Sequence, residues 1–278
     1  MRTKHGMRGS AVAVVVLVSV FAAGWLSVAA ESPEGPRSAY YVTSGNQGVN
    51  WILHNSKATP FDQVHWFISG GFVFGEHAIV VDKTVRTLGT NSSTALIASD
   101  GAEYTRQGRY TGSDFPYPAE LPTTSGILDA TTDGQYIYGL DFYDATVWRM
   151  DLDWTHPVEL FHVVANDEGI TYDPSNNGTL WISSLAQNQT IRQYTLTGDV
   201  ISSFTIPTGA SALARDPHDG TLWFGDGFDG TFYHYSTGGQ FLGSMTYPAL
   251  AGWNHLGGEF RFSRAARVRV STSSDGPK

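Results

Sequence analysis

The stretch that decides the fold is Glu168–Pro207, EGITYDPSNNGTLWISSLAQNQTIRQYTLTGDVISSFTIP, because its pattern occurs again directly after it. The next copy is Ala210–Pro248, ASALARDPHDGTLWFGDGFDGTFYHYSTGGQFLGSMTYP, and an earlier copy covers Ile127–Val163. Trp181 and Trp223 occupy equivalent positions 42 residues apart. A self-similar unit of this length indicates a repeat architecture built from identical supersecondary modules.

Each copy divides into four short strands. In the copy at 168–207 we expect strands at residues 169–172, 179–183, 191–196 and 200–206, separated by turns rich in Asp, Asn, Pro and Gly. Turns of this composition join antiparallel neighbours. No sustained helical periodicity follows residue 30. Four strands in a unit of about 40 to 45 residues are typical of a propeller blade, so the sequence predicts an all-β protein, a β-propeller.

The earlier part of the chain matches the repeat less closely but can be divided in the same way. The second, third and fourth strands of one blade are expected at 39–44, 48–54 and 64–69, and the four strands of the next at 77–82, 84–88, 95–99 and 103–110. Residues 252–260 match only a first strand. Pairing it with the strand at 39–44 would close the ring and remove two exposed sheet edges. We therefore predict about five blades, or six if residues 70–126 contain another.

The N-terminal segment has the layout of an export signal. Three basic residues precede an apolar run at 11–28, and small residues follow, ending at Ala30. We expect a cleaved signal peptide, with a retained membrane anchor as the alternative. The expected division of the chain is a signal peptide at 1–30, a spacer at 31–37, the propeller at 38–260 and a basic, disordered tail at 261–278. The mature protein is then secreted or extracytoplasmic and monomeric, with no membrane span.

Charge and composition exclude several classes of function. The formal net charge is −9, and between residue 30 and Phe260 there are 9 basic and 25 acidic residues. A body this acidic repels phosphate backbones, so nucleic-acid binding is not expected. The chain has no cysteine, which excludes disulfides, thiol chemistry and cysteine zinc sites. The expected partner is a protein, a polysaccharide or a small-molecule ligand.

Two segments resemble secreted bacterial propellers. They are EGITYDP (Glu168–Pro174) followed by NGTLWI (Asn177–Ile182), and ARDPHDGTLWFG (Ala214–Gly225). The families that they resemble are the SdiA-regulated-like and esterase-like propellers and, more loosely, the NHL and SMP-30-like superfamily, over residues 127–248. The export signal, the propeller and LGGEF (Leu256–Phe260) also resemble exported proteins with a PEP-CTERM sorting tail, although the Val-Pro-Glu-Pro motif and its hydrophobic helix are absent here.

The resemblance implies where a site would lie. Enzymatic propellers place it at the mouth of the central channel, on the loops that enter the innermost strands. The division above sets Glu168, Ser211 and Asn254 at that point in three consecutive blades, with Asp167 and His255 beside them. SMP-30-like hydrolases hold a divalent metal there, which implies that Glu168 and Asn254 bind Ca²⁺ or another divalent cation. The alternative is that Glu168 accepts backbone hydrogen bonds in a tight loop, since the ring offers no second clear acid.

Other polar residues favour structural roles. Asp141 with Asp144 and Asp226 with Asp229 recur 85 residues apart and are expected to form Asx turns. Streptogramin lyase, another propeller enzyme, uses a channel histidine, and His255 is the one histidine placed near the channel here.

No nucleophile elbow, phosphate-binding loop or dinucleotide-binding fingerprint occurs in the sequence. The sequence leans against an enzyme without deciding the question. We expect a non-catalytic binding or scaffold module of the cell envelope or extracellular space, with no cofactor. The alternative is a metal-dependent hydrolase or lactonase with its site at the channel mouth, followed by a lyase of the streptogramin type.

Overall fold

The structure is a computed structural model that describes residues 35–262 except 45–47, 70–71, 90, 93–96, 99, 123–125, 186–189 and 227. All of these residues belong to one compact unit, which begins at Pro33. The expected signal peptide and most of the expected tail lie outside the described residues.

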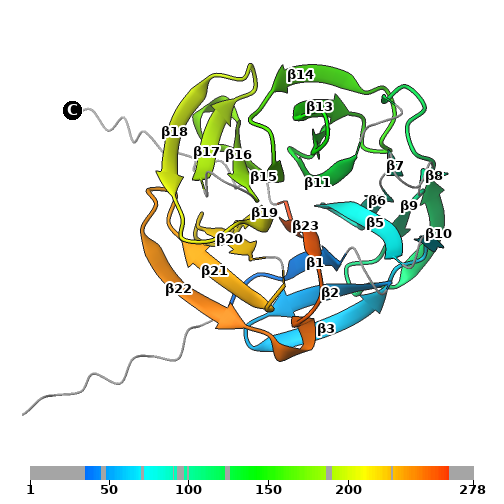
Figure 1. Cartoon of the computed structure of the whole chain (residues 1–278), viewed down its shortest axis with the longest axis horizontal. Coiled ribbons are helices and arrows are strands. Elements are labelled where there is room, and N and C mark those ends of the chain that lie inside the picture. Colours follow the sequence, from blue (N-terminus) through cyan, green and yellow to red (C-terminus); the bar gives the residue numbers. More distant parts are fainter. Residues whose placement is uncertain are drawn as a thin grey trace, which may run out of the picture. The chain divides into compact units, whose positions relative to one another are not determined.

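Five four-stranded antiparallel blades surround a common centre (Figure 1), which confirms the prediction of an all-β propeller and sets the blade number at five. We number the blades 1 to 5 along the chain. From the innermost to the outermost strand, blade 1 consists of β23 (His255–Phe260), β1 (Tyr40–Ser44), β2 (Val49–His54) and β3 (Lys57–Asp62), and blade 2 of β5 (Phe72–Val81), β6 (Val85–Gly89), β9 (Gly101–Tyr104) and β10 (Tyr110–Phe115). Blade 3 consists of β11 (Ile127–Thr132), β12 (Ile137–Asp141), β13 (Thr146–Met150) and β14 (Val158–His162), and blade 4 of β15 (Asp167–Asp173), β16 (Thr179–Ser184), β17 (Thr190–Thr195) and β18 (Val200–Thr205). Blade 5 consists of β19 (Ser211–Arg215), β20 (Leu222–Gly225), β21 (Thr231–Tyr235) and β22 (Phe241–Thr246).

The helical elements among the described residues are two short 3₁₀ turns, η1 (Ser175–Asn177) and η2 (Pro248–Leu250). Neither is long or apolar enough to span a membrane.

The ring closes through blade 1, as the sequence predicts. Strand β23 pairs antiparallel with β1, and Tyr40 lies opposite Phe260. The two rings stack with their centroids 4.7 Å apart. The Tyr40 hydroxyl donates a hydrogen bond to the carbonyl of Ala212 in blade 5. The end of the chain therefore completes the blade that its beginning starts, and it also ties that blade to its neighbour.

Three of the predicted strand assignments are wrong. The fourth strand of blade 1 is β3 and not 64–69, because Asn55 adopts a positive φ of 52° and folds β3 directly back onto β2. Residues Trp66–Ser69 form β4 instead, which pairs with β5, the innermost strand of blade 2. In blade 2 the third and fourth strands are β9 and β10, rather than 95–99 and 103–110.

The reason is an insertion between the second and third strands of blade 2. There β7 (Asn91–Ser92) pairs with β8 (Ile97–Ala98), which contains the only described residues of the predicted strand 95–99. Blade 2 therefore carries two additions to the repeat, this small pair and β4.

The hydrophobic core consists of clusters that each lie between two neighbouring blades. One contact recurs at three junctions: a phenylalanine on the outermost strand of one blade packs against a tyrosine on the third strand of the next. The pairs are Phe61–Tyr104, Phe161–Tyr194 and Phe204–Tyr235, with ring centroids 5.3 to 6.0 Å apart. Burial of one such ring contributes about 1.5–3 kcal/mol, so the blades are held together chiefly by these repeated apolar contacts.

Ring closure leaves no room for a side chain at Gly258 of β23. A Cβ atom there would lie 2.4 Å from the carbonyl oxygen of Ala212, a backbone atom of the neighbouring blade. We expect Gly258→Ala to lower the free energy of unfolding by about 1–3 kcal/mol, because the blades must separate to accept the methyl group. Urea denaturation would measure it. Gly238→Ala is the matched control, since its nearest neighbour would be 3.7 Å away. Equal stability of the two variants would contradict the close approach of β23 to β19.

Candidate functional site

The innermost strands share one irregularity at the end of the channel where they begin. Where each innermost strand starts to pair with the second strand of its blade, the register shifts by one residue. The shift lies between Glu76 and Ala78 in β5, Ile127 and Asp129 in β11, Asp167 and Gly169 in β15, and Ser211 and Ala214 in β19. In β23 it shifts between His255 and Gly258. Each strand therefore has a β-bulge at an equivalent position, and bulges redirect side chains at the ends of strands. The bulged residues are His77, Leu128, Glu168, Ala212 and Leu256.

The structure places the predicted site residues at this mouth, at two levels. Asp167, Ser211 and His255 are paired residues at equivalent positions just before the bulge, and Glu168 is the bulged residue itself. Asn254 precedes β23 and is half-buried. The other four predicted residues are buried. The set therefore shares one end of the ring, but Glu168, Ser211 and Asn254 are not equivalent: Glu168 lies one residue after the position of Ser211, and Asn254 one residue before it.

Glu168 is enclosed without compensation. Within the described part of the chain, neither of its carboxyl oxygens has a hydrogen-bond partner, and the side chain is 1% exposed. Burial raises its pKa from 4.5 to about 8. The expectation that Glu168 accepts backbone hydrogen bonds is therefore wrong for the described residues. Because an isolated charge is costly in such surroundings, the carboxyl group is neutral at pH 7.

Asp167 differs from Glu168 because it has a cationic partner. Its Oδ1 lies 3.2 Å from Nη1 of Arg192. Burial raises the pKa of Asp167 to about 6, although the charge of Arg192 acts in the opposite direction.

His77 is a mouth residue that the sequence analysis missed. It is the bulged residue of β5, and neither ring nitrogen has a partner among the described residues. Burial lowers its pKa to about 4, and it does the same to His255, whose Nε2 lies 3.2 Å from the carbonyl oxygen of Leu250. Both imidazoles are therefore neutral at pH 7.

The centre of the ring is filled by hydrogen-bonded carboxyl groups. Asp129 of β11 accepts backbone N–H groups from Ala130 at 2.8 Å, Ile170 of β15 at 3.0 Å and Gly258 of β23 at 3.0 Å. Glu259 is a second buried carboxyl group, and it accepts the N–H of Phe260 at 2.9 Å. Burial raises the pKa of both groups. Through these hydrogen bonds the buried acids link innermost strands to one another. The expectation that the ring offers no second clear acid beside Glu168 is therefore wrong.

The described residues contain no group of three or more His, Asp or Glu side chains arranged to hold a metal ion. The expected cation site on Glu168 and Asn254 stays a prediction. The repeated aspartates do form Asx turns: Oδ1 of Asp141 accepts the N–H groups of Tyr143 and Asp144, and Oδ1 of Asp226 accepts that of Asp229.

A groove of about 610 Å³ lies between blades 2 and 3, which is within the usual range for ligand sites. It occurs where the recurring Phe–Tyr junction is altered. In blades 2, 4 and 5 a glycine with positive φ ends the turn after the third strand and covers the neighbouring phenylalanine, as Gly198 covers Phe161. In blade 3 the turn has the same pair of backbone hydrogen bonds, but Trp154 stands at that position, with φ 66°.

Trp154 is fully buried in the cluster between blades 2 and 3. Its turn, residues 151–157, is longer than the turns of the other blades. Phe115 pairs with Gly101 in blade 2 as Phe204 pairs with Ile191 in blade 4, so the two phenylalanines are equivalent. Because the turn of blade 3 is longer, Phe115 lines a groove instead of packing under a glycine. A non-glycine residue in this conformation costs on the order of 1–3 kcal/mol, which the buried indole offsets.

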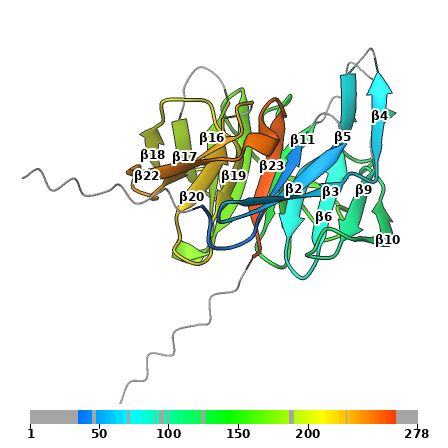
Figure 2. The same ribbon diagram turned by 90° about the horizontal axis from the view of Figure 1, so that it is seen from below.

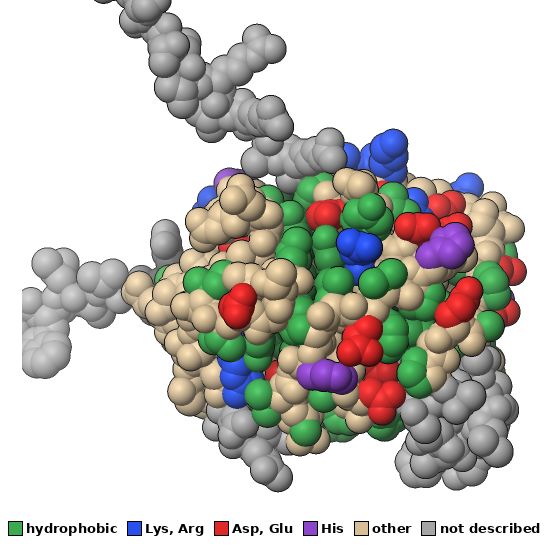
Figure 3. Space-filling model, turned by 90° about the horizontal axis from the view of Figure 1, so that it is seen from above, with side chains coloured by type: hydrophobic (Ala, Val, Ile, Leu, Met, Phe, Trp, Pro, Cys, Tyr) green, Lys and Arg blue, Asp and Glu red, His purple; other side chains and the backbone are tan. Residues whose placement is uncertain are grey.

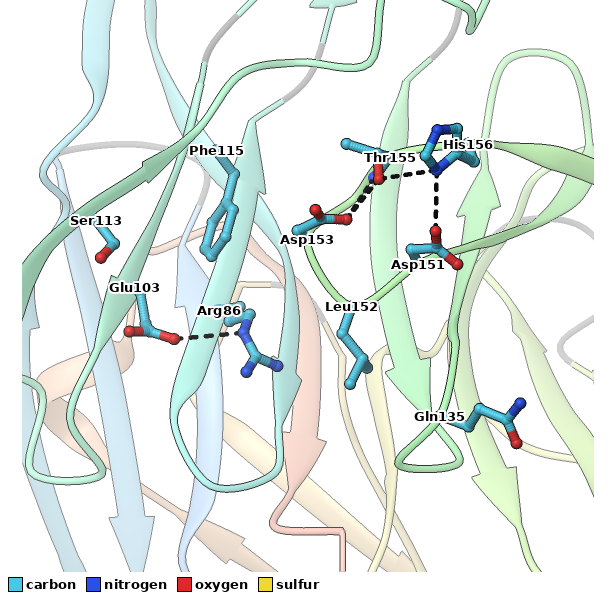
Figure 4. Close-up of a pocket in the computed structure, with 10 residues that line it drawn as sticks. All are labelled: Arg86, Glu103, Ser113, Phe115, Gln135, Asp151, Leu152, Asp153, Thr155 and His156. Carbon is cyan, nitrogen blue, oxygen red and sulfur yellow. Dashed lines mark hydrogen bonds and ion pairs between the residues drawn. The ribbon is translucent and has the colours of Figure 1, made fainter.

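Polar side chains from both blades face each other across this interblade groove (Figure 4). In blade 2, Oε2 of Glu103 forms an ion pair with Nε of Arg86 at 3.4 Å. From blade 3, Oδ2 of Asp151 lies 2.9 Å from Nδ1 of His156, and Oδ1 of Asp153 accepts the hydroxyl of Thr155 at 2.6 Å. The remaining lining residues are Ser113, Phe115, Gln135 and Leu152.

A hairpin of β4 and the first half of β5 stands out beyond the ring (Figure 2). It precedes the bulge of β5, whereas the groove is lined by residues near the other end of the innermost strands, such as Arg86 and Gln135. Trp66 and Ile68 alternate along β4, so they share one face, and they are 52% and 64% exposed. Val64, in the bend before β4, is 37% exposed. Glu76 fixes the base: its Oε1 accepts the N–H groups of Val64 at 3.0 Å and His65 at 2.9 Å. The hairpin thus presents an apolar face on a firmly held base.

The charged side chains do not gather into one patch on the face of the molecule seen in Figure 3. On the side of the molecule drawn in Figure 3, acidic, basic and hydrophobic side chains are interspersed, without a large patch of one sign.

Comparisons with known proteins show the fold alone. No protein-family model matches the chain, and no curated protein is similar to it in sequence. A nidogen/laminin complex contains a chain with a TM-score of 0.51 and 12% identity, covering 81% of this chain and 99% of that one. Virginiamycin B lyase from Staphylococcus aureus has a TM-score of 0.44 and 15% identity, covering 77% and 73%. A streptogramin B lyase has a TM-score of 0.43 and 18% identity, covering 77% and 70%.

The buried carboxyl group of Glu168 makes stability depend on pH. Its pKa is higher in the folded than in the unfolded chain, so folding is favoured below pH 4.5 and loses stability as the pH rises from 4.5 to about 8. We expect the wild type to lose on the order of 3 kcal/mol relative to Glu168→Gln between pH 5 and 7.5, at roughly 1.4 kcal/mol per pH unit.

Urea denaturation of both proteins across this range would measure that difference. Comparing them cancels His77 and His255, which act in the opposite direction because their stabilising effect is lost as the pH falls from 6.5 to about 4. Glu159→Gln, an exposed position, controls for the loss of one carboxyl group. Parallel pH curves for the wild type and Glu168→Gln would show that Glu168 is not buried as described.

Proposed function

We propose that the protein is an exported, non-catalytic binding module that recognises a protein partner through the β4–β5 hairpin of blade 2. The observation that carries the proposal is the exposed apolar face of Trp66 and Ile68, with Val64 beside it, on an insertion that no other blade has among the described residues. In repeat proteins, insertions map to loops on one face, which is often the binding face. Exposed tryptophan is also among the residues that contribute most to protein–protein affinity.

The centre of the ring supports the same proposal. A catalytic channel needs polar groups that are free to meet a substrate, whereas the carboxyl group of Asp129 is occupied by backbone N–H groups from three strands. Export follows from the basic and apolar N-terminal segment of the sequence. The fold is compatible with a binding role, since one similar structure is that of a nidogen/laminin complex.

The hairpin proposal predicts that Trp66→Ser with Ile68→Ser strongly weakens partner binding without unfolding the ring. Loss of a central aromatic contact costs at least about 2 kcal/mol, or roughly thirtyfold in affinity. The partner would be cross-linked to the wild type in the extracellular fraction, identified by mass spectrometry and titrated against each purified variant.

Phe241→Ser with Leu242→Ser is the matched control, because this pair is also apolar and exposed, at 54% and 44%, but lies on the outer strand of blade 5. It should bind like the wild type. Undiminished binding by the hairpin variant, or equal loss in the control, would contradict the proposal.

The second candidate is a metal-dependent hydrolase or lactonase at the channel mouth. It is favoured by one observation: Glu168 is buried, and in the described residues neither of its carboxyl oxygens has a hydrogen-bond partner. A bound cation could supply the missing interaction.

Thermal unfolding with Ca²⁺ and with EDTA separates the two candidates. A binding module without metal should unfold at the same temperature in both. A bound cation would raise the midpoint by several degrees, because a ligand that binds only the folded state stabilises it. If Ca²⁺ stabilises the wild type but not Glu168→Gln, the hydrolase replaces the binding module as our conclusion.

A further inference from the structure

The last described residues leave the ring beside blades 2, 3 and 4, where the ring of Phe262 lies 6.1 Å from that of Tyr172 in blade 4. The backbone N–H of Phe262 donates to the carbonyl of Val81 at 2.7 Å. Val81 is the last residue of β5, where the turn to β6 starts. Its ring lies against the turn between β11 and β12, where a Cβ atom on Gly134 would be 2.7 Å from Cε1. Phe262 therefore contacts one turn from each of the two blades that form the interblade groove.

Both of these turns continue directly into the groove. Gln135, which follows Gly134, is a lining residue. Asp82, which follows Val81, forms an ion pair with Nη1 of Arg86 at 3.2 Å, and Arg86 also lines the groove. The chain thus passes the edge of the groove at Phe262, and whatever follows it starts beside these side chains.

The groove favours positive charge. Glu103, Asp151 and Asp153 line it, whereas its one lining cation, Arg86, is already paired with acids. The imidazole of His156 is affected by the same acids: the hydrogen bond and charge of Asp151, with further contributions from Glu120 and Asp153, raise its pKa. A cationic group at this position is therefore stabilised by two carboxylates of blade 3, Asp151 and Asp153, and by Glu120 of the connection between blades 2 and 3.

The sequence that follows Phe262 has the complementary charge. It reads SRAARVRV at 263–270, outside the described residues, with Arg264, Arg267 and Arg269 and no acid. An extended chain advances about 3.3 Å per residue, so Arg264 is within roughly 7 Å of Phe262 and Arg269 within roughly 23 Å. All three arginines are within reach of a groove that begins at Gln135.

We propose that the interblade groove is a binding site for an arginine-bearing peptide, and that its occupant is the chain's own segment 263–270. Guanidinium groups form paired hydrogen bonds with carboxylates. Asp151 and Asp153 line the groove on the turn opposite Glu103, where their carboxylates contact His156 and Thr155 (Figure 4). The interaction joins largely exposed charges, so salt weakens it. This inference does not depend on the hairpin, which lies at the other end of the ring.

Cross-linking in the full mature chain tests it, and the absence of native cysteine makes the labelling specific. Ser113→Cys in the groove is combined with Ala266→Cys, and a short bis-maleimide is added at low protein concentration. We expect an intrachain product several-fold above that of the control Ser202→Cys with Ala266→Cys, whose first cysteine is on the exposed outer strand of blade 4. The excess should vanish in 0.5 M NaCl, where the Debye length is a few ångströms.

Charge exchange in the same cross-linking protein tests the chemistry. Asp151→Lys with Asp153→Lys should remove the excess, and adding Arg264→Glu with Arg267→Glu should restore it. If the lysine pair fails to fold, Asp151→Asn with Asp153→Asn should still lower the yield. A product formed only between chains, rising with protein concentration, would overturn the self-occupied groove in favour of a second copy's segment. A yield equal to the control at low salt would overturn the site altogether.

Discussion

The antiparallel pairing of β1 with β23 is the constraint on which the rest of the structure depends. It joins residues more than 200 positions apart and brings five innermost strands to one centre. Without it, β1 and β23 would each expose an unpaired edge, and the bulged residues would share no common mouth. The contacts that secure it are specific: Tyr40 stacks on Phe260, and the backbone of Gly258 approaches Ala212 too closely for any side chain.

Closing the ring at five blades leaves a narrow centre, which the chain fills with acids. A buried carboxyl group is tolerated when it is hydrogen-bonded or neutral, and both solutions occur here. Asp129 is satisfied by three backbone donors, whereas Glu168 has none among the described residues and is held neutral. The centre thus serves cohesion, and the features open to a partner lie outward, on blade 2 and at its junction with blade 3.

The repeat and the ring closure could be predicted because strand period and turn composition are local properties of the sequence. The third and fourth strands of blade 2 could not, since the inserted β7–β8 pair interrupts the period. Glu168 was placed at the correct end of the ring but one residue from its expected equivalents, because a bulge leaves no mark in composition. His77 and Asp129 were missed for the same reason. The groove had a visible signal, however: DLDWT at 151–155 has tryptophan where TLTGD at 195–199 has glycine.

The measurement that tests the account most directly is native-state hydrogen exchange of the innermost strands at increasing urea concentration. If β1 and β23 close the ring, their amides should exchange only through global unfolding, with the same free energy and urea dependence as those of β11 and β15. If β1 and β23 instead exchange through a separate opening several kcal/mol lower, while β11 and β15 stay protected, the ring does not depend on its closure and the central claim is wrong.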